Sequence, residues 1–205
     1  MSYRVNEIFY SLQGEGARAG AASLFVRFSG CNQTCKVESH GFDCDTEFMS
    51  GREMTAEEIG SACVEAMDDP DLRAPVIFTG GEPLLQLDLP LLEYLASLGY
   101  TLPMLETNGS LPIPEDMKPW LAYVSCSPKV AEHAVRLERA DELRYVRAHG
   151  QGIPRPSCAA GRKYLSPAAI GDEIDPRSLA WCIELARSNP EWRLSVQQHK
   201  FWRVR

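Results

Sequence analysis

Short apolar runs and alternating apolar and polar positions recur along the chain in the pattern of β-strands. The first two predicted strands cover residues 3–10 and 23–29, and a glycine-rich turn separates them. Five more strands are predicted within residues 75–83, 101–109, 121–129, 141–148 and 163–167. Most of these segments are enriched in the β-branched and aromatic residues that fit a pleated sheet.

Apolar residues recur at helical spacing in three segments, residues 55–67, 88–99 and 175–190. The first segment has the pattern of a capping box, in which Thr55 caps the helix and Glu58 bonds back to the cap. Strands that alternate with helices predict parallel pairing through right-handed crossovers. The predicted fold class is therefore α/β.

One crossover lacks a helical pattern. Residues 148–162 contain three glycines and two prolines without helical periodicity, so they are predicted to form a loop in place of a helix. The length of 205 residues fits one domain, residues 1–205, better than two.

Polar motifs follow three of the predicted strands. They are TGGEP at residues 79–83, ETNGS at residues 106–110 and SCSPK at residues 125–129. The carboxyl ends of parallel strands meet at one edge of a sheet or one face of a barrel, where α/β folds bind their ligands. The three motifs are therefore predicted to line a common site.

The overall charge narrows the class of ligand. A net charge of -7 and a pI near 5.2 disfavour a nucleic-acid or membrane-surface binder, because such proteins usually carry a basic surplus. A small-molecule ligand is favoured instead. No apolar run reaches the roughly 18 residues of a membrane span, and the first residues lack the pattern of a signal peptide. A cytoplasmic location, without membrane or direct nucleic-acid partners, is expected.

The chain has seven cysteines, an odd number, and its first residues lack the pattern of a signal peptide. Both features favour metal binding over a disulfide framework. Cys31, Cys35 and Cys44 lie in the segment 29–48, the cluster loop, together with His40. Thiolates suit both zinc and iron-sulfur clusters. With His40 the loop offers a complete Cys3His zinc site, and without it three thiolates would leave one iron of a four-iron cluster open. The cysteine spacing by itself leaves both alternatives open.

The three cysteines, the GGEP turn and the parallel-sheet pattern together resemble the radical S-adenosylmethionine (SAM) superfamily. Within it, the chain is similar to the family of 7-carboxy-7-deazaguanine synthases. The segments that carry this resemblance are EIFYSLQGEG, FVRFSGCN, CDTEF, TGGEPLLQ, ETNGS, SPK and SVQQHK. The similarity extends over nearly the whole chain and is weakest between Asp141 and Asp175.

This resemblance implies a shortened, partial (β/α) barrel of the radical SAM type with mostly parallel strands, in a small homodimer. It implies a lyase that converts 6-carboxy-5,6,7,8-tetrahydropterin to 7-carboxy-7-deazaguanine with release of ammonia, in queuosine-type 7-deazapurine biosynthesis. The implied cofactors are a [4Fe-4S] cluster, SAM and Mg2+, with a reductant such as flavodoxin or ferredoxin as partner. The radical chemistry belongs to the cofactor, so no side chain is assigned a catalytic step of its own.

The resemblance also implies roles for individual residues. The implied metal ligands are Cys31, Cys35 and Cys44 for the cluster and Thr46 for Mg2+. Cofactor contacts are implied for Asp43, Asp45, Gly80, Gly81, Glu82, Glu106, Asn108, Ser127 and Lys129. Substrate contacts are implied for Leu12, Gln13, Gly14, Glu15, Arg27, Thr79, Gln197, His199 and Arg205. Arg27 would pair with the substrate carboxylate, because a guanidinium binds a carboxylate through two parallel hydrogen bonds.

The sequence departs from the family pattern at several points. The cysteines are spaced C-x3-C-x8-C, where the superfamily most often has C-x3-C-x2-C. Arg144 stands where the family often has a lysine. Residues 166–172, SPAAIGD, also depart from the family's usual motif, so the resemblance leaves cofactor contacts at Ser166 and Asp172 open. Two other functions stay open on these grounds. One is an activase that abstracts hydrogen from a glycine of a partner protein, and the other is a non-catalytic Cys3His zinc protein.

Overall fold

The computed structural model describes residues 1–67, 69, 71–171 and 173–205. The strands, in chain order, are β1 (Tyr3–Leu12), β2 (Ala22–Phe28), β3 (Arg52–Met54), β4 (Val76–Gly80), β5 (Pro103–Thr107), β6 (Tyr123–Cys126), β7 (Arg139–Arg147), β8 (Ala159–Pro167), β9 (Ala169–Ile170), β10 (Glu173–Ile174) and β11 (Arg193–Leu194). The α-helices are α1 (Val37–His40), α2 (Ala56–Glu65), α3 (Leu89–Ser97), α4 (Pro176–Ser188) and α5 (Gln198–Trp202). Short 3-10 turns are η1 (Gly16–Arg18), η2 (Pro83–Leu85), η3 (Lys118–Trp120) and η4 (Glu132–Ala134).

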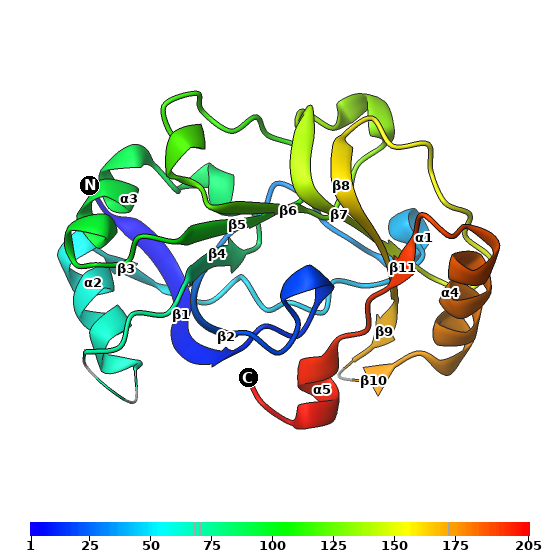
Figure 1. Ribbon diagram of the computed structural model, residues 1–205, viewed down its shortest axis with the longest axis horizontal. Helices are drawn as coiled ribbons and strands as arrows, with labels where there is room; N and C mark the ends of the chain where they lie inside the picture. The colour runs from blue at the N-terminus through cyan, green and yellow to red at the C-terminus, as the bar shows by residue number, and fades with distance from the viewer. Residues whose placement is uncertain (68, 70, 172) are drawn as a thin grey trace.

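Within these residues, nine strands form one sheet in the order β11-β8-β7-β6-β5-β4-β2-β1-β3 (Figure 1). Every pairing from β2 across to β11 is parallel, whereas β1 runs antiparallel to both β2 and β3. The end strands β3 and β11 are not paired with each other, so the sheet stays open. The predicted α/β class, with mostly parallel strands in a partial barrel, is confirmed.

The seven predicted strands and three predicted helices are all present. The capping box at the start of α2 is formed, because Thr55 Oγ1 accepts from the Glu58 backbone N–H and Glu58 Oε2 accepts from the Thr55 N–H. The short strands β3, β9, β10 and β11 were not predicted. Each is only two or three residues long, which is too short for a periodic pattern to be seen in the sequence.

The predicted Gly/Pro-rich loop is shorter than expected, because β8 already begins at Ala159. Gln151 fixes the remaining loop. Its Nε2 donates to the backbone oxygen of His40 at 2.8 Å, and its own backbone oxygen accepts from Trp181 Nε1 at 2.8 Å. These two hydrogen bonds attach the loop between β7 and β8 to the cluster loop and to α4. The loop takes the place of a crossover helix.

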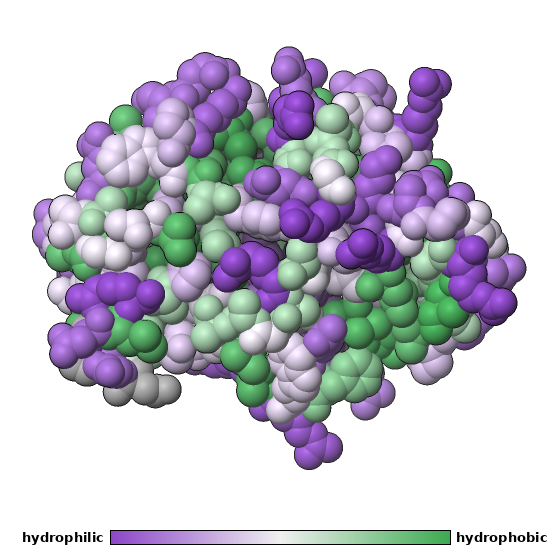
Figure 2. Space-filling view, in the orientation of Figure 1, coloured by the Kyte–Doolittle hydropathy of each residue, from purple (hydrophilic) through white to green (hydrophobic). Residues whose placement is uncertain are grey.

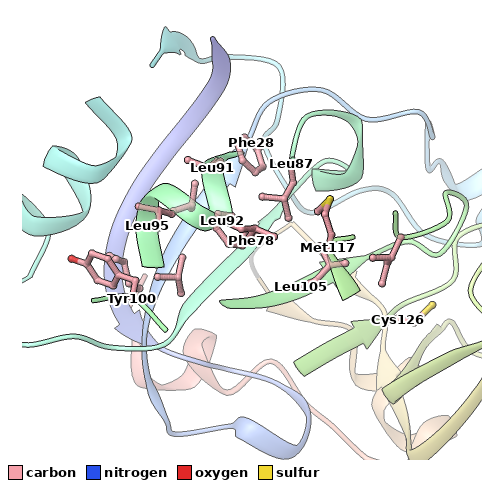
Figure 3. Close-up of a cluster of buried hydrophobic side chains, with 14 of the residues drawn as sticks. Phe28, Phe78, Leu87, Leu91, Leu92, Leu95, Tyr100, Leu105, Met117 and Cys126 are labelled. Atoms are coloured by element: carbon pink, nitrogen blue, oxygen red, sulfur yellow. The ribbon is translucent and has the colours of Figure 1, made fainter. Parts of the chain in front are cut away.

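The larger hydrophobic core lies between the sheet and helices α2, α3 and α4. Leu91, Leu92 and Leu95 of α3 are buried beside Phe28 of β2 and Phe78 of β4 (Figure 3). Burying a side chain of this size stabilises the fold by about 1.5–3 kcal/mol. The helices thus cover one face of the sheet, here called the outer face. Side chains on the opposite, inner face are available to form a binding site.

Hydrophilic and hydrophobic side chains are interspersed on the face shown in Figure 2. Large exposed apolar side chains include Ile170 on β9 and Phe201 on α5, which are 72% and 63% exposed. Among the described residues, no helix is long and apolar enough to cross a membrane.

Candidate functional site

The inward side chains of the parallel strands form two layers. Phe25, Ile77 and Met104 are neighbours in register and form a small apolar cluster. Two positions farther toward the carboxyl ends, where side chains point to the same face, the residues are polar. The polar positions are Arg27, Thr79, Glu106, Ser125 and Glu142. Strand alternation thus places a polar layer directly above an apolar floor.

Arg144 of β7 lies at the centre of the polar layer and is 6% exposed. Its guanidinium nitrogens lie 3.6 Å from Glu15 Oε2, 3.5 Å from Glu106 Oε1 and 3.5 Å from Glu142 Oε1. Burial by itself lowers the pKa of Arg144, but the three carboxylates raise it above its ordinary value. Burial raises the pKa of Glu15, and Arg144 opposes that rise. One cation therefore holds three carboxyl groups together.

The segment between β1 and η1 crosses above this layer. Gln13 Nε2 donates to Glu106 Oε1 at 2.9 Å. Gly14 packs so closely against His199 that an added Cβ would lie 2.0 Å from the ring Nδ1. The backbone N–H of Gln198, at the start of α5, donates to the Gly14 oxygen at 2.9 Å, which brings the C-terminal helix beside the segment that follows β1 (Figure 1). The glycine at position 14 is therefore required by the packing of α5.

Cys31, Cys35 and Cys44 line one cavity, here called the thiol cavity. Its lining also includes Glu15, Asp43, Asp45, Thr46, Thr79, Gly80, Gly81, Glu106, Asn108, Ser127, Lys129, Arg144, Ser166 and Gln197. All three thiols are free. Burial raises the pKa of Cys31 and of Cys35, and the nearby Cys44 sulfur adds to the rise in both. The three sulfurs therefore lie close enough to influence one another.

Lys129 is a half-buried cation that lines the thiol cavity together with Arg144. Its Nζ donates to Ser127 Oγ at 2.8 Å and lies 5.7 Å from the centre of the Phe42 ring. Burial and the neighbouring Arg144 lower the pKa of Lys129, whereas Cys35 opposes that change.

Gly80 and Gly81 let the end of β4 pass against the start of the cluster loop. An added Cβ on Gly81 would lie 2.0 Å from the Gly30 oxygen and 2.8 Å from Cys31 Cβ. Gly80 has a φ of +131°, a conformation that favours glycine. The resemblance implied cofactor contacts for these glycines, and the structure shows that they also permit close approach of two protein segments.

Glu82 takes a different place from the other predicted site residues. Its side chain is fully buried, and its two oxygens accept from Thr107 Oγ1 and from the backbone N–H of Asn108, each at 2.8 Å. Its backbone N–H donates to the Gly30 oxygen at 3.0 Å. Glu82 thus joins the ends of β4 and β5 to the cluster loop, and the cofactor contact that the resemblance implied for it stays a prediction.

A second cavity, here called the arginine cavity, contains Arg27 and Arg205. Both guanidinium groups bind Glu7, with Arg27 Nε 2.9 Å from Oε1 and Arg205 Nη2 2.9 Å from Oε2. Both also lie over the Phe9 ring, at 5.9 and 5.6 Å from its centre. Its lining also includes Leu12, Gln13, Gly14, Glu15, Asp45, Thr46, Thr79, Glu106, Gln197 and His199.

The two cavities share part of their lining and so form one continuous cleft. The shared residues are Glu15, Asp45, Thr46, Thr79, Glu106 and Gln197. Every predicted site residue except Glu82 lines one cavity or the other. Asp172, for which the sequence left a cofactor contact open, lies outside the described residues.

Comparisons with known proteins bear on what this cleft binds. Residues 12–109 match the family model of a 4Fe-4S single cluster domain. The chain is 36% identical over 219 residues to the 7-carboxy-7-deazaguanine synthase of Bradyrhizobium diazoefficiens. It is 36% identical over 206 residues to the synthase of Bacteroides thetaiotaomicron, and both alignments cover 100% of both chains. The chain belongs to the 7-carboxy-7-deazaguanine synthase family.

The fold agrees with membership of the synthase family. The crystal structure of QueE from Escherichia coli superimposes with a TM-score of 0.69 at 24% identity, covering 97% of this chain and 95% of that one. A member of the synthase family is a radical SAM lyase that uses a [4Fe-4S] cluster and SAM.

The thiol cavity of this synthase-family chain fits a four-iron cluster better than a single zinc. Around one zinc, sulfurs at about 2.3 Å from the metal would converge on a point, whereas each iron of a cluster takes its own thiolate. Among the described residues, no three His, Cys, Asp or Glu side chains are arranged to hold one ion. His40 has both ring nitrogens engaged, Nε2 with the Lys129 oxygen at 2.9 Å and Nδ1 with Ser39 Oγ at 2.8 Å.

Sequence reasoning missed the central position of Arg144 and the role of Glu7. The alternation of β7 shows that Glu142 and Arg144 share a face, but the other two carboxylates beside Arg144, those of Glu15 and Glu106, come from other segments. Glu7 has the sequence context of an ordinary polar strand residue, although it binds both Arg27 and Arg205 in the arginine cavity. Only the register between β1 and β2, which pairs Glu7 with Arg27, would have indicated it.

Proposed function

We propose that this member of the synthase family converts 6-carboxy-5,6,7,8-tetrahydropterin to 7-carboxy-7-deazaguanine with release of ammonia, as one domain of residues 1–205. The observation that carries the proposal is the continuous cleft, with three free thiols at one end and three arginines, Arg27, Arg203 and Arg205, at the other. The thiol end suits the cluster and SAM, and the arginine end suits a carboxylated substrate.

At the thiol end, Cys31, Cys35 and Cys44 are the proposed ligands of three irons. When bound, the cluster and SAM supply the one-electron chemistry that abstracts hydrogen from the substrate. The chain's own residues shape the space for SAM. Asp43, Asp45, Gly80, Gly81, Glu106, Ser127 and Lys129 are the proposed cofactor contacts, and all of them line the cavity. Glu82 contributes by fixing the backbone of the turn.

At the arginine end, Arg27 is the proposed partner of the substrate carboxylate. Its Nε is engaged by Glu7, which leaves the two terminal nitrogens to form the parallel hydrogen bonds that a carboxylate accepts. Arg205 lies on the other oxygen of Glu7 and adds a second positive charge. The remaining proposed substrate contacts are Leu12, Gln13, Gly14, Glu15, Thr79, Gln197 and His199.

Thr46 is the proposed protein ligand of Mg2+, because it lies where the two cavities meet. Asp45 lies at the same boundary and supplies negative charge there. Burial by itself raises the pKa of Asp45, but the Gln197 amide at 2.8 Å and the Lys200 ammonium at 3.6 Å lower it below its usual range. Mg2+ prefers such hard oxygen donors and keeps several waters or substrate oxygens.

The resemblance to the synthase family also supports a homodimer, reduced by a flavodoxin or ferredoxin. The free state of all seven cysteines suits a cytoplasmic location, where thiols stay reduced.

The test is anaerobic incubation of the reconstituted chain with carboxytetrahydropterin, SAM, Mg2+ and dithionite. Mass spectrometry of the products should show 7-carboxy-7-deazaguanine, ammonia release and 5'-deoxyadenosine. A Cys35→Ala variant is the control and should form none of them. Cleavage of SAM by the wild-type chain without any deazapurine would refute the proposed substrate while leaving the cluster assignment intact.

A further inference from the structure

A closed ring of side-chain hydrogen bonds joins the turn after β5 to the cluster loop. Asn108 Nδ2 donates to Asn32 Oδ1 at 3.0 Å, and Asn32 Nδ2 donates to Ser110 Oγ at 2.9 Å. Ser110 Oγ completes the ring by donating to Asn108 Oδ1 at 2.5 Å. Each member both donates and accepts, so the direction of every bond around the ring is defined.

The orientation of the Asn108 amide is fixed independently of the ring. The backbone N–H of Ser110 donates to Asn108 Oδ1 at 2.9 Å, and a backbone N–H can only donate. The atom facing it must therefore be the oxygen, and Nδ2 must point the other way. The backbone N–H of Asn108 is in turn held by Glu82 Oε2 at 2.8 Å, and the residue is 6% exposed.

The amide nitrogen points at a cluster cysteine. Asn108 Nδ2 lies 3.9 Å from Cys31 Sγ, within the longer range of hydrogen bonds to sulfur. The backbone N–H of Gln33 donates to the same sulfur at 3.4 Å. Among the described residues, no such N–H donor reaches the sulfur of Cys35 or Cys44, so Cys31 differs from the other two.

All four hydrogen-bonding positions of the Asn108 amide are engaged within the protein. Its two N–H groups are directed at Asn32 and Cys31, and its oxygen accepts twice from Ser110. An amide offers two donors and two acceptor positions, and all four are engaged. The cofactor contact that the resemblance implied for Asn108 stays a prediction, whereas the contact of its amide with a cluster cysteine is present in the structure.

We propose that Asn108 tunes the reduction potential of the [4Fe-4S] cluster by donating a hydrogen bond to the Cys31 thiolate. The inference rests on the proposed ligation of the cluster by Cys31. A donor to a cluster sulfur stabilises the reduced, more negatively charged state and so raises the potential. Asn108 thereby makes the cluster easier for its electron donor to reduce. The Ser110 backbone N–H holds the amide in the donating orientation, and Asn32 accepts its other N–H.

The test is an EPR-monitored reductive titration of the full chain, anaerobically reconstituted, with iron and sulfide measured in each sample. Asn108→Asp keeps the shape and the acceptor oxygen but replaces the donor, and Asn108→Ala removes the whole amide. Ser110→Ala is the matched control, since it opens the ring but leaves the Ser110 backbone N–H that orients Asn108.

Both Asn108 variants should have a more negative midpoint potential than the wild type at equal iron content, with the larger shift in Asn108→Asp because it adds negative charge. Ser110→Ala should titrate with the wild type. Resonance Raman spectra should show a shifted Fe–S(Cys) stretch in the Asn108 variants, even in a sample that loads poorly. Wild-type potentials in both Asn108 variants, or an equal shift in Ser110→Ala, would overturn the proposal. A wild-type chain that binds no four-iron cluster would instead refute the ligation by Cys31.

Discussion

Replacing Arg144 by glutamine should be the most damaging single change in the polar layer. Glutamine is similar in reach but uncharged, and it would leave Glu15, Glu106 and Glu142 facing one another without their cation. At 3.5 Å and an effective dielectric constant of about 20, each contact represents roughly 5 kcal/mol of Coulomb energy before desolvation is subtracted. Removing one partner of a buried ionic network costs about 3–5 kcal/mol, and we expect a loss of that size at pH 8.

The loss should shrink as the pH falls. Burial already raises the pKa of Glu15, and without Arg144 that pKa rises further. A carboxyl group whose pKa in the folded state lies above its unfolded value contributes stability at low pH and loses it as the pH rises through the folded pKa. The difference between Arg144→Gln and the wild type should therefore be smaller at pH 5.5 than at pH 8.

The assay is urea unfolding followed by tryptophan fluorescence, under anaerobic conditions and at matched iron content. With an m-value of about 2–3 kcal/mol/M, the midpoint should fall by about 1–2 M at pH 8. Arg147→Gln is the control on the same strand. The Arg147 guanidinium lies 4.9 Å from the centre of the Tyr145 ring, a contact worth about 0.5–1 kcal/mol. Equal losses for both variants, or a loss for Arg144→Gln that does not change with pH, would refute the reasoning.

Three further predictions concern the two cavities. Arg27→Ala should reduce deazapurine formation at least tenfold while leaving the cleavage of SAM without substrate within about twofold; equal losses in both assays would mean that Arg27 supports the fold or the cofactor instead. His40→Ala should leave the iron content unchanged, because both ring nitrogens are engaged elsewhere, and a fall in iron per chain would make the histidine a ligand. Gly81→Ala should lower cluster loading and stability, because its Cβ would lie 2.0 Å from the Gly30 oxygen, whereas Gly152→Ala has open space and should behave as the wild type in iron analysis and thermal unfolding.

Local sequence patterns predicted much of the fold. The capping box at Thr55 and the capping of α3 by Asp88 depend on residues three positions apart, so the sequence indicates both. The long strands were predictable for the same reason, because alternation along a strand is a property of neighbouring residues. The strands β3, β9, β10 and β11 were missed because two or three residues are too few to show periodicity, and only their pairing in the folded chain defines them.

For the site, the sequence by itself determined the chemistry. It supplied three thiols on one loop, a glycine turn after a strand, and arginines with polar residues at strand ends. These are residue types at short spacings, which the chain order displays directly. The tertiary structure alone decided their partners. It buried Glu82 as a link between strands, engaged both nitrogens of His40 and directed the amide of Asn108 at Cys31. The physical reason is that hydrogen bonds and charge pairs depend on distances of a few ångströms between segments far apart in the chain, and only the packed register of the sheet sets those distances.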